Sequence, residues 1–134
     1  MKSKQYKDID YAVARLLLDR QVPQKKTITY SDCAAILSGI LGRPVNPHFS
    51  LRWPLYRVAG ICYALDLPFI TTLVVSKNQT NGPQAGEGFY KMASGYRAEY
   101  KSMRPEDIWE IEHQRLINCK DWSKLDAFLK RAGW

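Results

Sequence analysis

The sequence has few of the residues that most often carry chemistry. It contains two histidines and three cysteines. The cysteines, Cys33, Cys62 and Cys119, are odd in number and lie far apart in the sequence. This spacing matches neither a disulfide framework nor a zinc site, and neither His48 nor His113 has a second ligand at metal-binding spacing. No stretch approaches the roughly 18–20 apolar residues of a membrane-spanning helix. We therefore expect no metal, no cofactor and no membrane span, and we expect Cys33 and Cys62 to be buried thiols.

The chain also lacks the arrangement of acids that metal-dependent hydrolysis requires. In restriction-type nucleases an acid stands before a lysine at a strand end, with one residue between them, and it holds a metal and a water. Residues 75–77 read Val-Ser-Lys, so valine occupies that position. The segment 86–88, Gly-Glu-Gly, indicates either an acid held on a closely approaching backbone or a simple β-bulge. A metal-dependent nuclease is therefore the least favoured interpretation, and we expect no hydrolytic activity.

Length and composition indicate one folded domain over residues 1–134. A chain of 134 residues with 46% hydrophobic and 25% charged residues is long enough to bury a core without disulfides. Its N-terminus is charged and does not resemble a signal peptide, so a cytoplasmic protein is expected. The formal net charge is +7, and 7 of the 20 basic residues lie within the first 26. Such a balance is compatible with nucleic acid or another acidic partner.

Apolar residues at three- and four-residue spacing predict five helices. Thr29 with Asp32 three residues later resembles a capping box for the second helix, and Gly42 is expected to end it. Pro54 is expected in the first turn of the third helix, where its missing N–H does no harm. The last two helices form a C-terminal pair to which Trp109 and Trp122 contribute packing. The expected helices cover residues 6–20, 30–41, about 50–65, 104–118 and 122–131.

The stretch 67–77 is the densest in β-branched and apolar residues, and the other elements are expected to pack around it. Turn-forming residues fill 78–88, and Phe89-Tyr90 follow. This pattern predicts a two-stranded hairpin, and Thr27–Thr29 predicts one further short strand. The fold class expected is α+β, with an N-terminal helix, a two-stranded hairpin and a C-terminal helical pair.

This order of elements resembles a winged helix. In residues 28–42 a short strand and a tyrosine precede a capped helix, as in many winged-helix modules. Alkyltransferase-like proteins are one example, but the Pro-Cys-His-Arg type of acceptor motif is absent here. Residues 67–77 with Gly86-Glu87-Gly88-Phe89 are similar to small uncharacterised bacterial proteins associated with mobile elements and phage defence genes. That similarity spans roughly residues 27–90. It implies that the protein belongs with mobile-element or defence genes, but it does not imply a particular activity.

A winged-helix-like domain implies binding of nucleic acid through the third helix and the hairpin wing, with duplex DNA as the expected partner. A helix fits the major groove and arginine can read guanine, while a polar hairpin tip can donate hydrogen bonds to phosphates. The alternative for each feature is a solvated helix face and an ordinary polar turn. The nine candidate contacts are Lys25, Lys26, Arg43, Arg52, Tyr56, Arg57, Lys77, Asn78 and Lys91.

A second function remains open at this point. Non-enzymatic nucleic-acid binding is the preferred function, and the alternative is a small protein-binding inhibitor or accessory factor of a bacterial or phage defence or counter-defence system. The target of such a factor would be a protein or a ribonucleoprotein. Winged helices serve both roles, so the fold does not decide between them. A homodimer is also left open, since it would add a second half-site on a duplex.

Overall fold

The computed structural model describes residues 6–76 and 87–134, and it is mostly helical with one small sheet. The α+β class is therefore confirmed. The elements in chain order are α1 (Asp8–Leu16), the π-helical turn η1 (Leu17–Gln21), α2 (Val22–Gln24), β1 (Ile28–Thr29), α3 (Tyr30–Leu41), α4 (Phe49–Ala64), the 3-10 turn η2 (Ile70–Leu73), β2 (Val74–Val75), α5 (Glu87–Tyr96), the 3-10 turn η3 (Ala98–Ser102), α6 (Pro105–Asn118) and α7 (Ser123–Arg131).

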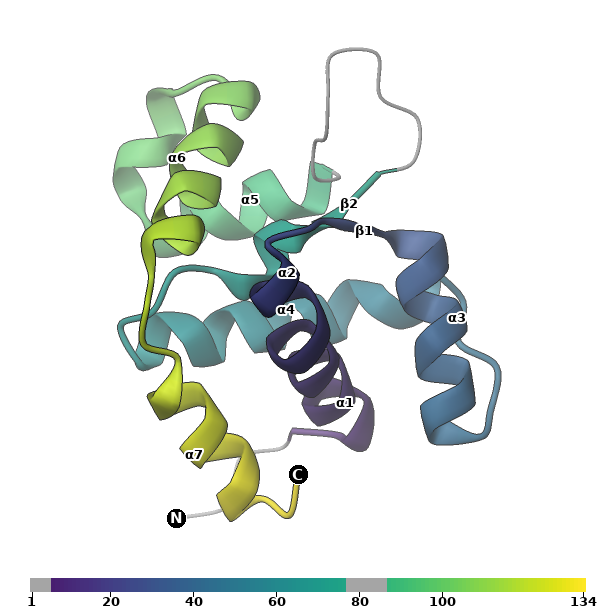
Figure 1. The fold of residues 1–134 in the computed structure, drawn as a ribbon. Coiled ribbons are helices and arrows are strands. Elements are labelled where there is room, and N and C mark those ends of the chain that lie inside the picture. The colour runs from purple at the N-terminus through teal and green to yellow at the C-terminus, as the bar shows by residue number, and fades with distance from the viewer. Residues whose placement is uncertain (1–5, 77–86) are drawn as a thin grey trace.

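Helices α1 and α4 pack against each other in the middle of the molecule. Helix α3 and helix α7 also contact α1, while α5 packs on α4 and α6 packs on the turn η2 (Figure 1). The largest fully buried side chains come from several of these elements, among them Leu17, Leu51, Phe69 and Leu125. The elements thus pack around one hydrophobic core, and α1 and α4 pass through it.

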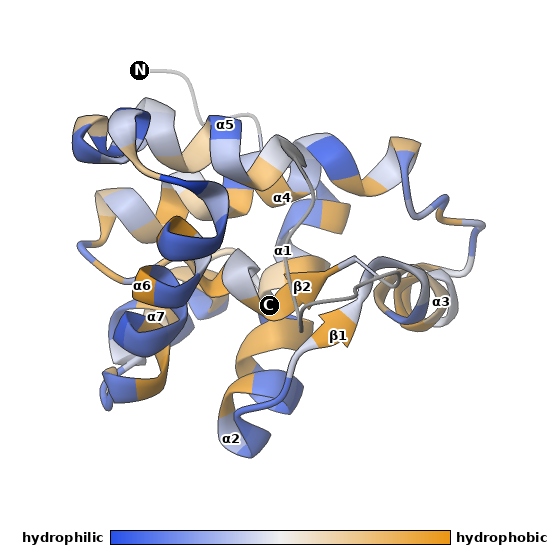
Figure 2. Cartoon of the chain, turned by 90° about the horizontal axis from the view of Figure 1, so that it is seen from above, coloured by the Kyte–Doolittle hydropathy of each residue, from blue (hydrophilic) through white to orange (hydrophobic). Residues whose placement is uncertain are grey.

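The sheet consists of two parallel strands. Ile28 is paired with Val74 and Thr29 with Val75, and the connection between the strands contains α3 and α4. Parallel pairing requires a long crossover of this kind. The two strands are among the most hydrophobic segments in Figure 2, and Val74 and Val75 are 1% and 4% exposed. Both faces of β2 are therefore buried, as is usual for a parallel strand.

The expected hairpin is wrong for the part of the chain that the structure describes. Strand β2 pairs with β1, and Phe89 lies in α5 instead of in a second hairpin strand. Phe89, Met92 and Ala93 are buried at three- and four-residue spacing, which is the pattern of an amphipathic helix. The expected wing tip, with Lys77 and Asn78, lies outside the described residues. Of the features expected for a winged helix, the structure therefore has the helices and the first short strand, and it does not have the hairpin among the described residues.

Most of the β-branched stretch before β2 forms the turn η2. The N–H and the hydroxyl of Thr72 both donate to the carbonyl oxygen of Phe69, at 3.1 and 2.7 Å. The carbonyl of Thr72 in turn accepts from the indole N–H of Trp109 at 3.2 Å. This network satisfies buried polar groups locally, so that a turn can occupy the core where a strand was expected.

Helix α3 follows the sequence-based expectation closely. The hydroxyl of Thr29 accepts a hydrogen bond from the N–H of Asp32 at 3.1 Å, as an N-cap does. The helix ends at Gly42, whose φ of +69° is the left-handed conformation that glycine adopts without strain. Both ends of this helix could be predicted because the residues that cap it, Thr29 and Gly42, directly flank it in the sequence.

Helix α4 begins earlier than expected, so the placement of Pro54 in its first turn is wrong. The side-chain oxygen of Asn46 accepts from the N–H groups of His48 and Phe49, at 2.8 and 2.9 Å, and the hydroxyl of Ser50 accepts from the N–H of Asn46 at 3.0 Å. This reciprocal arrangement starts the helix at Phe49. Pro54 then lies inside the helix, where it removes one backbone hydrogen bond.

The N-terminal helix also runs further than expected. The π-helical turn Leu17–Gln21 continues α1 into α2, and the helix ends at Lys25, whose φ is +54°. The side-chain amide of Gln21 donates to the carbonyls of Lys26 and Thr27 at 2.8 and 3.3 Å. These bonds hold the exit of the helix against the start of β1.

The two C-terminal helices exist as expected, but they pack on different neighbours. Helix α7 contacts α1, where Arg15 donates to the Asp126 carboxylate and to the Trp134 carbonyl at 2.8 and 3.0 Å. Trp109 of α6 instead contacts η2, as described above. Trp122 is buried. Both tryptophans therefore contribute packing as predicted, and Trp109 does so by joining α6 to η2.

Helix α6 is fixed by a buried carboxylate, Glu112. The hydroxyl of Tyr100 donates to Glu112, the guanidinium of Arg97 lies 3.1 Å from it, and the N–H of Phe69 donates to it at 3.4 Å. Burial, together with this hydrogen bond to a carboxylate, raises the pKa of Tyr100. A buried charge satisfied from three sides ties α6 to η2, η3 and the end of α5.

We predict that Leu73→Ala lowers the free energy of unfolding by about 2–5 kcal/mol, because Leu73 is completely buried in η2. The control is Ile40→Ala on α3, since Ile40 is 52% exposed and should change stability by less than about 0.5 kcal/mol. Urea unfolding followed by circular dichroism measures both. Equal losses would contradict the placement of η2 in the core.

Candidate functional site

The outward face of α4 carries a row of exposed aromatic side chains. Phe49, Trp53, Tyr56 and Tyr63 are 85%, 54%, 42% and 45% exposed. Their spacing of four, three and seven residues places them on one side of the helix. Large apolar side chains gathered on one surface generally mark a binding site.

The aromatic rings of this face contact one another and Tyr96 of α5. The rings of Trp53 and Tyr56 stack with centroids 5.8 Å apart, and Tyr96 lies 6.0 Å from Tyr56 and 4.9 Å from Tyr63. A Cβ atom at Gly60 would lie only 2.6 Å from the hydroxyl of Tyr96. Glycine at this position therefore lets α5 approach α4. We call Trp53, Tyr56, Tyr63 and Tyr96 the aromatic row.

An arginine lies at each end of the aromatic row, but the two differ in charge balance. The Arg52 guanidinium is 5.3 Å from the centroid of the Trp53 ring, a cation–π distance, and no carboxylate of the described residues pairs with it. The guanidinium of Arg97 is 5.6 Å from the Tyr63 ring and also pairs with Glu112. The charge of Arg97 is thus balanced by Glu112, whereas Arg52 has no carboxylate partner among the described residues and can pair with an anionic ligand.

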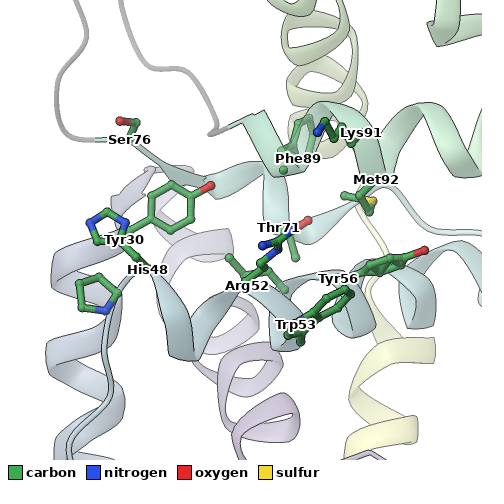
Figure 3. Close-up of a pocket in the computed structure, with 13 residues that line it drawn as sticks. Tyr30, His48, Arg52, Trp53, Tyr56, Thr71, Ser76, Phe89, Lys91 and Met92 are labelled. Atoms are coloured by element: carbon green, nitrogen blue, oxygen red, sulfur yellow. The ribbon is translucent and has the colours of Figure 1, made fainter.

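A cavity of about 670 Å³ opens beside the Arg52 end of the row (Figure 3). It lies between α4, the start of α3, the end of β2 and the first turns of α5, and its size is within the range of small-molecule sites. Aromatic rings, a histidine and two cations form much of the wall, and none of the described residues in that wall is acidic. The lining residues are Tyr30, Pro47, His48, Arg52, Trp53, Leu55, Tyr56, Thr71, Ser76, Gly88, Phe89, Lys91 and Met92.

Three of the nine candidate contacts meet at this cavity: Arg52, Tyr56 and Lys91. Figure 3 shows Arg52 and Tyr56 on α4, with Lys91 across from them on α5. Lys91 was one of the nine candidates, and the unexpected helix α5 brings it to the site. This group is the part of the predicted surface that forms a common site.

Two further candidates are engaged in ion pairs within the protein. Arg57 donates to both oxygens of the Asp10 carboxylate, at 2.6 and 3.0 Å, and Asp10 is completely buried. Arg43 pairs in the same two-pronged way with the exposed Asp8, at 3.0 and 2.9 Å, which lowers the pKa of Asp8. Both guanidinium charges are therefore already balanced.

Of the remaining four candidates, two lie away from the cavity and two lie outside the described residues. Lys25 and Lys26 are exposed in the turn after α2 and do not line the cavity. Lys77 and Asn78 lie outside the described residues, as does Gly86. Glu87 and Gly88 begin α5 and do not form the expected β-bulge.

Sequence reasoning missed Tyr30, His48, Trp53 and Thr71 as site residues. From the sequence, Trp53 has no assigned role and His48 is considered only as a metal ligand. The available signal was the spacing of Phe49, Trp53, Tyr56 and Tyr63, which runs opposite to the buried stripe of the same helix. Tyr30 and Thr71 reach the cavity only through tertiary contacts, which leave no local pattern.

Two of the cysteines are buried thiols, as expected, and His113 packs against an aromatic ring. Cys33 and Cys62 are buried, and burial raises the pKa of each thiol to about 12, so both remain protonated. His113 stacks on Trp109 with centroids 4.4 Å apart, and its burial lowers its pKa. Residues 6–76 and 87–134 contain no cluster of three or more His, Cys, Asp or Glu side chains suited to a metal.

Within the same described part of the chain, no helix has both the length and the apolar character needed to cross a membrane. No protein-family model matches the sequence, and neither a curated protein nor a solved structure matches it significantly. Function therefore has to be inferred from the side chains of the site.

We predict that Arg57→Ala destabilises the protein by on the order of 3 kcal/mol, because it leaves the buried carboxylate of Asp10 without its ion-pair partner. Adding Asp10→Leu to Arg57→Ala should restore part of the loss, since the unpaired buried charge is then removed. Thermal unfolding of the single and double variants measures this. A single variant as stable as the parent would contradict a structural role for Arg57.

Proposed function

We propose that the protein binds nucleic acid on the outer face of α4, and that unpaired nucleotides are its preferred form. The observation that carries the proposal is the exposed aromatic row beside a cavity whose described lining contains cations and no acid. Stacked aromatic side chains beside a cationic groove are the common design of single-strand binding proteins.

The aromatic row supplies platforms on which bases can stack. Trp53 and Tyr56 are about half exposed, and their rings are already held by contact with each other and with Tyr96. Because the rings are ordered before binding, little conformational entropy is lost when a base stacks on them. Each such stack contributes roughly 1–3 kcal/mol, with little dependence on sequence.

The charge distribution supports an anionic ligand. The whole chain carries a formal charge of +7, and Arg52 and Lys91 face the cavity from opposite helices. Phosphates passing along this groove would lie near these two cations. Such contacts would position the strand without reading its sequence.

Duplex recognition by α4 in the winged-helix manner has weaker support. Arg57, expected to read base edges, is engaged by Asp10, and β2 belongs to a parallel pair and not to a hairpin wing. Aromatic rings stack poorly on paired bases, which are already stacked on each other. The geometry therefore favours bases that are free to turn outward.

A second candidate is binding to a protein, as a defence or counter-defence inhibitor would do. It is favoured by Phe49, which is 85% exposed at the first residue of α4 and would suit a partner's pocket. Such a contact would bury apolar area and depend little on salt. This dependence separates the two functions.

We predict that a fluorescently labelled single strand binds with an affinity that falls steeply between about 50 and 200 mM salt, by roughly 0.7 log units per log unit of salt for each phosphate contacted. Arg52→Ala should weaken binding and make the slope shallower by about one contact. Arg43→Ala is the matched control, because that guanidinium is already paired with Asp8. Fluorescence anisotropy measures all three proteins.

Absence of binding near 50 mM salt would overturn the nucleic-acid proposal and leave the protein-binding function. Equal effects of Arg52→Ala and Arg43→Ala would mean that the positive charge acts in general and that the α4 face is not the site. Circular dichroism of each variant checks that neither substitution unfolds the protein.

A further inference from the structure

The hydroxyl of Thr71 is a buried polar group without a hydrogen-bond partner, and Thr71 lines the cavity. Its side chain belongs to a residue that is 3% exposed, and no described group accepts from or donates to its Oγ1. An unsatisfied buried hydroxyl is costly and uncommon in native proteins, so its position calls for a partner such as a ligand or a bound water. A ligand atom in the cavity would satisfy it.

The neighbouring residue shows that the hydroxyl of Thr71 is not simply a packing element. Thr72 is also completely buried, but its hydroxyl donates to the Phe69 carbonyl at 2.7 Å and helps form η2. The two adjacent threonines of this turn thus differ in their hydroxyl groups. The hydroxyl of Thr72 is hydrogen-bonded within the protein, whereas that of Thr71 has no such bond and belongs to a residue that lines the cavity. Thr72 therefore serves as an internal reference for Thr71.

We propose that the cavity encloses the base of one unstacked nucleotide and that the hydroxyl of Thr71 hydrogen-bonds to the edge of this base. This inference rests on the proposed function and specifies where one nucleotide of the strand is held. A base has two apolar faces and a polar edge, and the cavity offers the aromatic and aliphatic walls of Tyr30, Trp53 and Met92 with a polar group at Thr71.

The polar groups around the cavity fit the rest of a nucleotide. A threonine hydroxyl can donate and accept, so it can bond to the edge of any base. Arg52 and Lys91 lie at the same cavity and are suited to the phosphate, since arginine and lysine are the usual phosphate ligands. A volume of about 670 Å³ leaves room for a sugar beside the base.

The test uses nucleoside monophosphates in place of a strand. The ¹⁵N-labelled full chain is titrated with AMP, CMP, GMP and UMP, and with ribose 5-phosphate, which has the phosphate and sugar but no base. Shifts of backbone and indole resonances give both the place and the affinity of binding. We expect saturable shifts at Thr71 and Trp53 with at least one nucleotide, and none of this size with ribose 5-phosphate.

The pair Thr71→Val and Thr72→Val distinguishes a ligand contact from a structural one. Thr71→Val should weaken nucleotide binding by about 10-fold, the equivalent of one good hydrogen bond, without lowering the melting temperature, since no protein bond is lost. Thr72→Val should lower the melting temperature and leave the nucleotide affinity within about twofold, because its lost bond is internal.

Equal shifts with ribose 5-phosphate, absence of shifts with all four nucleotides, or an unchanged affinity in Thr71→Val would overturn the base pocket. If single strands still bind in a salt-dependent way in that case, the proposed function stands and only the enclosed base is excluded. If neither strands nor nucleotides bind, both proposals fall.

Discussion

The buried carboxylate of Asp10 is the constraint on which the arrangement of α1 and α4 depends. A charge without solvent access is tolerated only when it is paired, and Arg57 supplies the partner through two hydrogen bonds of 2.6 and 3.0 Å. The Lys7 N–H adds a third bond at 2.9 Å. Because these bonds need a fixed geometry, they set the rotation of α4 about its own axis against α1.

The rotation of α4 in turn decides which of its residues face outward. With Val58 and Cys62 in the core, the aromatic row and Arg52 point away from α1. Gly60 lets Tyr96 pack against Tyr56 and Tyr63 of α4, which brings α5 and Lys91 to the opposite wall of the cavity. One internal ion pair therefore contributes to stability and also arranges the side chains proposed to bind.

The fold was predictable from sequence where its causes are local. Helix α3 has its cap and its terminating glycine within a single stretch, so both were read correctly. The pairing of Val74 with Ile28 joins residues separated by two helices, and the partner of Arg57 lies 47 positions away, so no local pattern reveals either. Helix α5 was not predicted, because Phe89-Tyr90 directly follows a run of turn-forming residues and fits the start of a strand as well as that of a helix. Of the site, Arg52 and Tyr56 were foreseen, whereas Thr71 depends on tertiary contacts.

The central claim is that the aromatic face of α4 prefers unpaired bases. The most direct measurement is a competition experiment in which a labelled single strand, bound to the protein at about 100 mM salt, is displaced by unlabelled single strand or by the duplex of the same sequence and length. The account predicts that the single strand competes at a concentration about tenfold or more below that of the duplex, because only free bases stack on Trp53 and Tyr56. Equal competition, or stronger competition by the duplex, would contradict it.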